Sequence, residues 1–266
     1  AWLLVWPDKI AYNTADGTVK QLEAEYTSAE DVTFTLCSVD GTPYENYYTG
    51  TEAPDSTKYT YWLDTSSAPH VLRVYSTATN LWNSVPTTYV RIGCSGLGAG
   101  FAAYDAVEIS GCKDEQFNTT MIVWKQGDDY IVVTGIIDEA FTQTTEQGAV
   151  AVARRAPDME FLTEHENRVW GCSSEKNEIY ACKLGDPTNW YCYQGIASDS
   201  YAATVGTDGP FTGAATHLGY VLFFKENCIH KVFGTKPSNY QITKVDCRGV
   251  QRGSEKSLCV VNETLF

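Results

Sequence analysis

Basic side chains, methionines and long apolar runs are all scarce in this sequence. Lysine and arginine number 19 against 33 aspartates and glutamates, which gives the 266-residue chain a formal net charge of -14. Such an acidic excess argues against a protein that wraps nucleic acid through phosphate contacts. No window approaches the roughly 18 apolar residues of a membrane helix, and the start of the chain has no basic region ahead of an apolar one, as a secretion signal would. We therefore predict neither a membrane protein nor a sequence-specific nucleic-acid binder.

Helical periodicity is also missing, and this absence decides the fold class. Short runs of β-branched and aromatic residues recur between clusters of Gly, Asn, Asp and Ser, which is typical of strands joined by turns. The clearest runs are Val71–Tyr75, Thr87–Ile92, Tyr130–Thr134 and Gly219–Phe224. With 43% hydrophobic residues the chain can bury a core. The sequence therefore predicts an all-β protein.

A unit of strand, tight turn and strand occurs several times along the chain. It covers Leu3–Tyr12, Arg168–Leu184 and Tyr220–Phe233, and Leu258–Val261 followed by Leu265–Phe266 resembles the opening of another unit. The later units are spaced by roughly 40–50 residues, which suits the four-stranded blades of a β-propeller. We predict a partial or complete set of propeller-like blades, with a β-sandwich of long hairpins as the alternative.

The middle of the chain interrupts this spacing. Five short strand-like pieces without a blade-like unit occupy residues 88–155, enough for a small inserted β-barrel or Greek-key domain. The blades then form a discontinuous domain of residues 1–87 and 156–266. Because Val260–Phe266 stops inside a predicted strand, we expect the chain to be a piece of a longer protein, truncated at its C-terminus.

Nine cysteines stand in the chain, and no two have the C-x-x-C spacing of a zinc or redox motif. Several lie in apolar strand-like runs, where a thiol acts as a small hydrophobic side chain. We expect reduced, buried thiols in a protein assembled in a cytoplasm. Cys228 and His230 share one strand face, but two ligands do not make a metal site, so no metal or cofactor is predicted.

Two other patterns could carry chemistry. The glycines of 93–100 follow a strand, but another strand-like segment comes next, so a dinucleotide would find no helix N-terminus. Carboxylates occur in the pairs Asp114–Glu115, Asp128–Asp129 and Asp138–Glu139, where a solvated turn is favoured over a glycosidase dyad. Asp199 with Asp208 offers oxygen ligands for calcium, but without the spacing of a known calcium loop. No catalytic residue is predicted, and we expect the protein not to be an enzyme.

Four tryptophans recur near predicted strand ends or turns. In a blade such rings most often pack between sheets, but exposed rings would make a stacking platform for a glycan on a host surface. The candidate ligand-binding residues are Trp62, Trp82, Trp170 and Trp190.

Two groups of motifs resemble proteins of bacteriophages. Tyr61–Ser66, Pro69–Tyr75 and Asn80–Val85 resemble a short module of phage tail and fibre proteins. The stretches 166–172, 185–190, 224–234 and 249–257 resemble prophage structural proteins of gut Firmicutes. These motifs cover about a quarter of the chain. The resemblance implies a non-enzymatic structural component of a virion, tail or head–tail associated, that contacts other virion proteins and forms a homo-oligomer.

Two further hypotheses stay open at this stage. One is a carbohydrate-binding or glycan-cleaving β-propeller, with a host-surface glycan as ligand. The other is an adhesion module of a bacterial cell surface. If the protein is instead a virion component that lines a DNA conduit, an acidic wall would let the genome slide without sticking.

Overall fold

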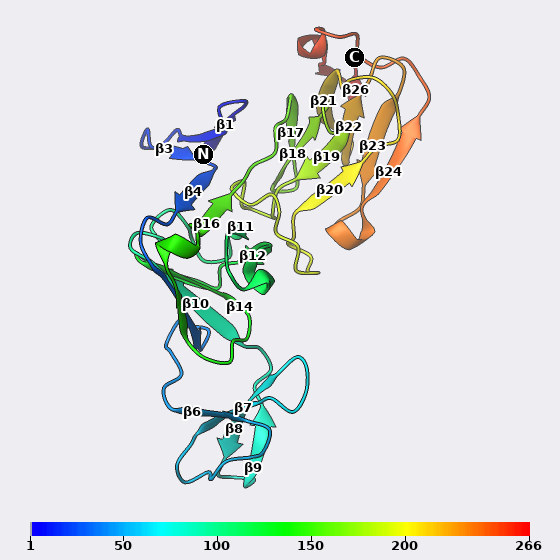
Figure 1. Cartoon of the computed structure of the whole chain (residues 1–266). Helices are drawn as coiled ribbons and strands as arrows, with labels where there is room; N and C mark the ends of the chain where they lie inside the picture. Colours follow the sequence, from blue (N-terminus) through cyan, green and yellow to red (C-terminus); the bar gives the residue numbers. More distant parts are fainter. Residues whose placement is uncertain (1) are drawn as a thin grey trace. The chain divides into compact units, whose positions relative to one another are not determined.

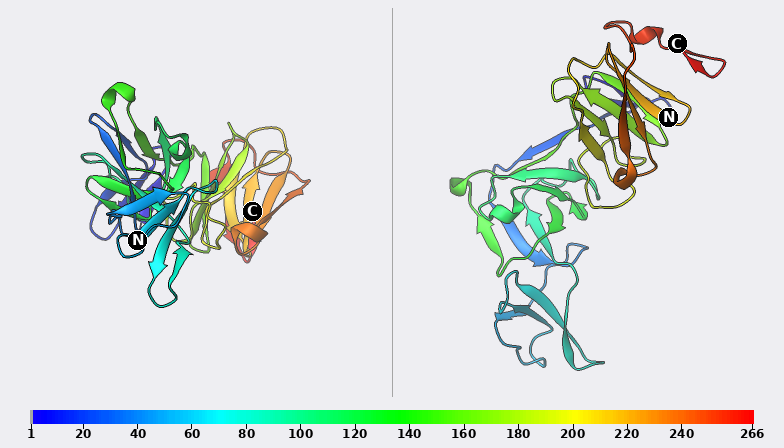
Figure 2. Two further views of the ribbon diagram at one scale, coloured as in Figure 1. Left: turned by 60° about the horizontal axis from the view of Figure 1, so that its bottom comes forward. Right: turned by 90° about the vertical axis from the view of Figure 1, so that its right-hand side faces the viewer.

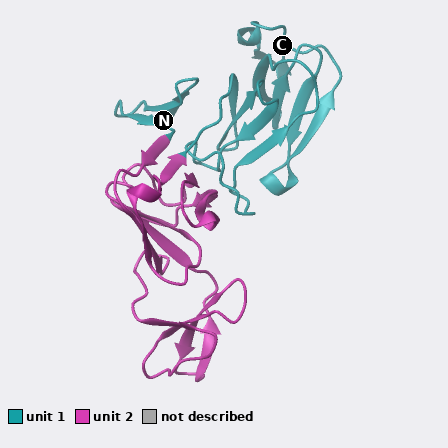
Figure 3. Ribbon diagram, in the orientation of Figure 1, with its two compact units in different colours: residues 1–23, 154–266 teal, residues 24–153 magenta. Residues whose placement is uncertain are grey.

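The computed structural model describes residues 2–266 and confirms the all-β prediction. It contains 26 strands and four single-turn 3-10 helices, and none of the described residues forms an α-helix. The 3-10 helices are η1 (Glu115–Phe117), η2 (Thr145–Gln147), η3 (Pro237–Asn239) and η4 (Glu255–Ser257). No helix in the described part is long and apolar enough to cross a membrane. The chain divides into two compact units, residues 1–23 with 154–266 (unit 1) and residues 24–153 (unit 2) (Figure 3).

Unit 1 contains two consecutive four-stranded antiparallel meanders, in which each strand pairs with the next along the chain (Figure 1). The strands of the first meander are β17 (Phe161–His165), β18 (Arg168–Ser173), β19 (Glu178–Ala181) and β20 (Tyr201–Thr204). The strands of the second are β21 (Gly213–His217), β22 (Tyr220–Phe224), β23 (Ile229–Phe233) and β24 (Gln241–Val245).

The two meanders pack face to face through one hydrophobic cluster. Their alternating pattern sends one set of side chains inward, and Trp170, Ile179, Phe211 and Phe223 are all buried there. The first strands of the two meanders, β17 and β21, lie side by side. The hydroxyls of Thr163 and Thr216 are 3.0 Å apart, and Thr216 Oγ1 donates to the carbonyl of Glu164.

A long connection joins β19 to β20 and is tied down by a buried cation. The guanidinium of Arg168 donates to the carbonyl oxygens of Cys182 (2.7 Å), Asp199 (2.5 Å) and Ala197 (2.7 Å), and Arg168 is only 2% exposed. Asp199 in turn accepts from the backbone N–H groups of residues 194–196 through Oδ2. Arg168 and Asp199 therefore hold this loop together with backbone hydrogen bonds such as that from the N–H of Leu184 to the carbonyl of Ser198.

Residues 2–23 belong to unit 1 although 130 residues separate them from the rest of it. They form a three-stranded sheet of β1 (Trp2–Val5), β2 (Ile10–Asn13) and β3 (Val19–Gln21). Trp6 Nε1 donates to the Pro157 carbonyl at 3.0 Å, and the Trp6 ring meets the edge of buried Trp190 at 5.6 Å. The end of unit 1 is a hairpin of β25 (Val260–Val261) and β26 (Thr264–Leu265).

Unit 2 is built on two sheets that enclose a core around Phe34, Ile92, Phe117 and Ile131. The five-stranded sheet has the order β13 (Lys125–Gly127), β14 (Tyr130–Thr134), β10 (Tyr89–Gly93), β5 (Val32–Cys37) and β15 (Phe141–Gln143). The four-stranded sheet has the order β12 (Thr120–Ile122), β11 (Ala106–Ser110), β16 (Ala151–Arg154) and β4 (Ala24–Thr27).

A third sheet lies at one end of unit 2 (Figures 1 and 2). Its strands are β6 (Tyr47–Gly50), β7 (Tyr61–Asp64), β8 (Val71–Ser76) and β9 (Leu81–Ser84), and the β6–β7 pair is parallel. Leu63 and Leu72 face the core of unit 2 and are fully buried. The opposite face carries Trp62 and Arg73, whose guanidinium lies 5.5 Å from the indole ring.

The division into units differs from the predicted domains. Residues 24–87 are predicted to belong to the blades, but they share unit 2 with most of the predicted insert 88–155. The physical reason is strand pairing, since β5 is hydrogen-bonded between β10 and β15 and β4 is a neighbour of β16. The two four-stranded meanders therefore belong to unit 1 and lie within residues 154–266. None of the sheets in residues 2–266 closes into a barrel or a ring of blades.

Candidate functional site

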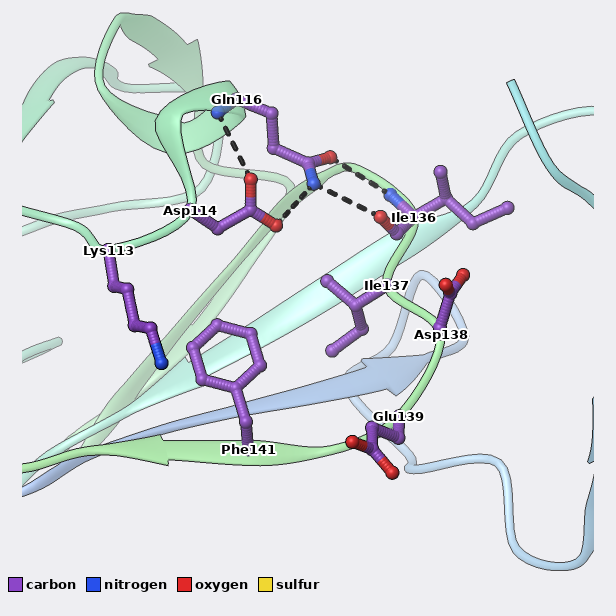
Figure 4. A pocket seen from close by; sticks show the side chains of 8 residues that line it. All are labelled: Lys113, Asp114, Gln116, Ile136, Ile137, Asp138, Glu139 and Phe141. Atoms are coloured by element: carbon purple, nitrogen blue, oxygen red, sulfur yellow. Dashed lines mark hydrogen bonds between the residues drawn. The ribbon is translucent and has the colours of Figure 1, made fainter. Parts of the chain in front are cut away.

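An acidic groove with a volume of about 460 Å³ lies on unit 2 (Figure 4). Two loops supply it, the one that leads into η1 and the one between β14 and β15. Its lining residues are Lys113, Asp114, Gln116, Ile136, Ile137, Asp138, Glu139 and Phe141.

Gln116 ties the two loops together across one end of the groove. Its side-chain Nε2 donates to Asp114 Oδ2 at 2.6 Å and to the carbonyl oxygen of Ile136 at 3.1 Å (Figure 4). Asp114 also accepts from the backbone N–H of Gln116 and so serves as the N-cap of η1. The carboxylate of Asp114 is therefore fixed before any ligand arrives.

Removal of this cap gives a test of the local geometry. We expect Asp114→Ala to lower the free energy of unfolding of unit 2 by about 1 kcal/mol, the usual cost of losing an N-cap. Asp114→Asn, which keeps an acceptor oxygen, should cost only a few tenths of a kcal/mol. Urea titration followed by tryptophan fluorescence measures both variants. Equal stability of Asp114→Ala and the unmodified protein would show that the cap contributes nothing.

Asp138 is held from the third sheet of unit 2. Its carboxylate Oδ1 lies 2.6 Å from Nδ1 of His70, in the turn before β8. The backbone carbonyl of Asp138 accepts from Tyr47 Oη at 3.1 Å and from Thr49 Oγ1 at 3.4 Å, both on β6. The loop 136–139 is thus clamped on both sides, by Gln116 and by the β6–β9 sheet.

The floor of the groove is apolar. Phe141 stacks on buried Phe34 with ring centroids 4.5 Å apart and nearly parallel planes, and Ile137 is 5% exposed. Three carboxylates and one lysine line it, so the lining carries a formal charge of -2. Such a surface suits a ligand with an alkyl stem and a cationic head.

Members of two predicted carboxylate pairs meet in this groove, because the sheets bring residues 113–116 and 136–141 together. The third pair has another role. Asp129 Oδ1 accepts from the N–H of Gly96 at 2.8 Å, and the carbonyl of Asp128 accepts from the N–H of Gly98. The N–H groups of Gly96 and Gly98 in the Gly-rich loop 93–100 are therefore hydrogen-bonded within the protein. The loop leads to strand β11, as predicted.

The predicted tryptophan platform needs correction. Trp170 and Trp190 are 2% and 1% exposed and Trp62 is 8% exposed, so none of these rings offers a free face for stacking on a sugar. Trp170 and Trp190 fill the clusters of unit 1, and Trp62 is covered by Arg73 and by the edge of Trp82 at 5.9 Å. Only Trp82 of the four is partly exposed, on β9.

The remaining candidate ligands have structural partners. Asp199 is used by its own loop, as described above. His230 is buried beside Cys228, and its Nε2 lies 2.8 Å from Thr207 Oγ1. Burial and the nearby charge of Lys225 hold the pKa of His230 below its usual value. Among residues 2–266, no three His, Cys, Asp or Glu side chains are grouped as a metal would require.

All nine cysteines are free thiols, and seven of them are buried, whereas Cys247 and Cys259 are exposed. Burial raises the pKa of Cys37 and Cys112 to about 12 and that of Cys182 to about 11. These thiols therefore serve the core as small apolar side chains, as the sequence predicts.

No protein-family model matches this chain, and no curated protein gives a significant match to it.

Proposed function

We propose that the chain is a non-enzymatic structural component of a phage or prophage virion, tail or head–tail associated, that acts as a scaffold and an interaction module. Unit 1 is the scaffold in this proposal, and unit 2 presents the interaction surface. The acidic groove, with its fixed rim and apolar floor, is the observation in favour of an interaction role for unit 2.

The blade-like architecture of unit 1 supports the scaffold role. Two successive four-stranded meanders stand with their first strands β17 and β21 side by side, as neighbouring blades do around a propeller axis. We propose that unit 1 is a propeller-like arc. Stiff stacked sheets of this kind hold their loops at fixed positions, and oligomer symmetry can then build a ring or tube.

The two units also differ in charge. Unit 2 contains 17 acidic and 5 basic side chains, a formal charge of -12, whereas unit 1 contains 16 and 14, a formal charge of -2. If the assembled protein borders a passage for DNA, we propose that unit 2 provides the repelling wall. A high-resolution structure of the particle with a neutral or basic passage wall would contradict this part of the proposal.

The glycan-binding alternative has lost its proposed site, because three of the four tryptophans are buried. The virion proposal has a direct test. Particles are induced from the bacterium that carries the gene, purified on a density gradient, and analysed by mass spectrometry and by immunogold labelling with an antibody against unit 2. We expect the protein in the particle fraction at many copies and gold at one end of the tail. Its absence from intact particles would refute the proposal.

A further inference from the structure

The occupant of the acidic groove can be inferred from the charges and shapes on the two units. We propose that the groove binds the basic segment 248–256 of a second copy of this chain, and that this contact joins copies head to tail. The inference deepens the proposed function, because it names the partner of the interaction surface on unit 2.

The groove is built for an arginine or lysine side chain. Phe141 and Ile137 offer an apolar surface for the methylene stem, and the face of the phenyl ring attracts a cation. Asp138 and Asp114 stand fixed on the rim, held by His70 and Gln116. Carboxylates that are already ordered bind a guanidinium with less loss of entropy than mobile ones.

The basic segment is the counterpart within this chain. Arg248, Arg252 and Lys256 are exposed, and within the described residues none of the three makes an ion pair. With Glu255 the segment carries a formal charge of +2, which matches the -2 of the groove lining in magnitude. Its backbone is anchored to unit 1, since the N–H of Gly249 donates to the carbonyl of Glu226 at 3.0 Å and the N–H of Arg252 to Glu226 Oε1.

The contact joins two different surfaces, a groove on unit 2 and a segment on unit 1. Such a heterologous contact repeats from copy to copy and closes into a ring or grows into a filament. Because charge pairs on a partly exposed rim are screened by salt, the association should be strongest at low ionic strength.

Charge reversal of both partners tests the proposal. Glu139→Lys reverses a groove carboxylate that is exposed and makes no hydrogen bond in the described structure. Arg248→Glu with Arg252→Glu reverses the segment. Sedimentation velocity of the full chain at low ionic strength should show self-association that each set weakens about tenfold or more. In the combined variant the new cation of the groove faces the new carboxylates of the segment, so its loss of affinity should be smaller than the product of the two separate losses. Glu52→Lys makes the same charge change on an exposed site of unit 2 outside the groove and should leave the association unchanged.

If Glu139→Lys and Glu52→Lys behave alike, or if the two losses simply multiply in the combined variant, the groove is not the docking site. A chain that stays monomeric at every concentration at low ionic strength also overturns the proposal. Circular dichroism of each variant shows whether it is folded. The test needs no virion, so it can fail while the chain is still found in particles.

Discussion

Arg168→Met should lower the free energy of unfolding of unit 1 by about 4 kcal/mol. The side chain is buried, and its guanidinium is the donor for three carbonyl oxygens of the connection between β19 and β20. Methionine fills a similar volume but donates nothing. The buried carbonyls of Cys182 and Asp199 then lose this partner at a cost of about 1–3 kcal/mol each, whereas water can reach the carbonyl of exposed Ala197. In thermal unfolding this loss corresponds to a midpoint lower by roughly 10 °C or more for a unit of this size. Near-ultraviolet circular dichroism of Trp170 and Trp190 follows the transition.

Two variants calibrate the effect of Arg168→Met. Arg168→Lys keeps the charge but lacks the planar fork of donors, so we expect a loss of about half the size. Lys176→Met removes an exposed cation from the turn after β18 and should change the midpoint by little. If Arg168→Met matched Lys176→Met, water or a rearranged loop would satisfy the three carbonyls, and the role given to Arg168 would be wrong.

Alkaline pH should destabilise both units steeply above about pH 9. Burial raises the pKa of Cys37 and Cys112 in unit 2, and of Cys172, Cys182 and Cys192 in unit 1. In the unfolded chain these thiols lose their protons near pH 9, whereas in the folded chain they keep them. The unfolded state then binds fewer protons, so the free energy of unfolding falls as the pH rises.

The slope follows from the number of buried thiols. Each contributes at most about 1.4 kcal/mol per pH unit, so Cys172 and Cys182 together should cost unit 1 about 3 kcal/mol per pH unit between about pH 9 and 11, and Cys192 acts in the same direction. The raised pKa of Tyr191 acts in the same direction at higher pH, while the lowered pKa of Lys225 opposes it. Against a typical total stability of about 5–15 kcal/mol, unfolding is expected before about pH 11.

Thermal midpoints measured from pH 8 to pH 11 with a phosphine reductant check this slope. Cys172→Ala should make the decline of unit 1 shallower by about one third to one half, although it lowers the midpoint at neutral pH. Cys247→Ser changes an exposed thiol and should leave the decline as it is. Midpoints that stay constant up to pH 10.5 would mean that the thiols titrate equally in both states.

Local patterns in the sequence predicted most strands, but not their partners. The expected hairpins at 168–184 and 220–233 appear as β18–β19 and β22–β23, because strand period and turn residues are encoded within a few positions. The pairing of Val32–Cys37 with Tyr89–Gly93 joins segments more than 50 residues apart, and no local signal specifies it. For this reason residues 24–87 were assigned to the wrong side of the boundary between the units.

The groove and the tryptophans show the same limit at the level of side chains. The carboxylates at 114 and 138 could be recognised as turn residues, but only the sheets of unit 2 bring them to one cavity with Phe141. Alternation along a strand places Trp62 and Trp170 on a face without saying what covers that face. Arg73 covers one ring and the neighbouring meander covers the other.

The chain leaves unit 1 and returns to it through two neighbouring strands, β4 and β16. Arg154 Nε donates to the Leu22 carbonyl at 3.0 Å, and the N–H of Ser28 donates to the carbonyl of Val150, so the outgoing and returning chains stay paired. The 130 inserted residues therefore leave and re-enter unit 1 at adjacent points, as the loop of a β-hairpin does. A different domain inserted in place of residues 24–153 would need to fit unit 1 only at the two adjacent strands β4 and β16. Exchange of residues 24–153 as one piece would therefore leave the sheets of unit 1 with their sequence and their packing.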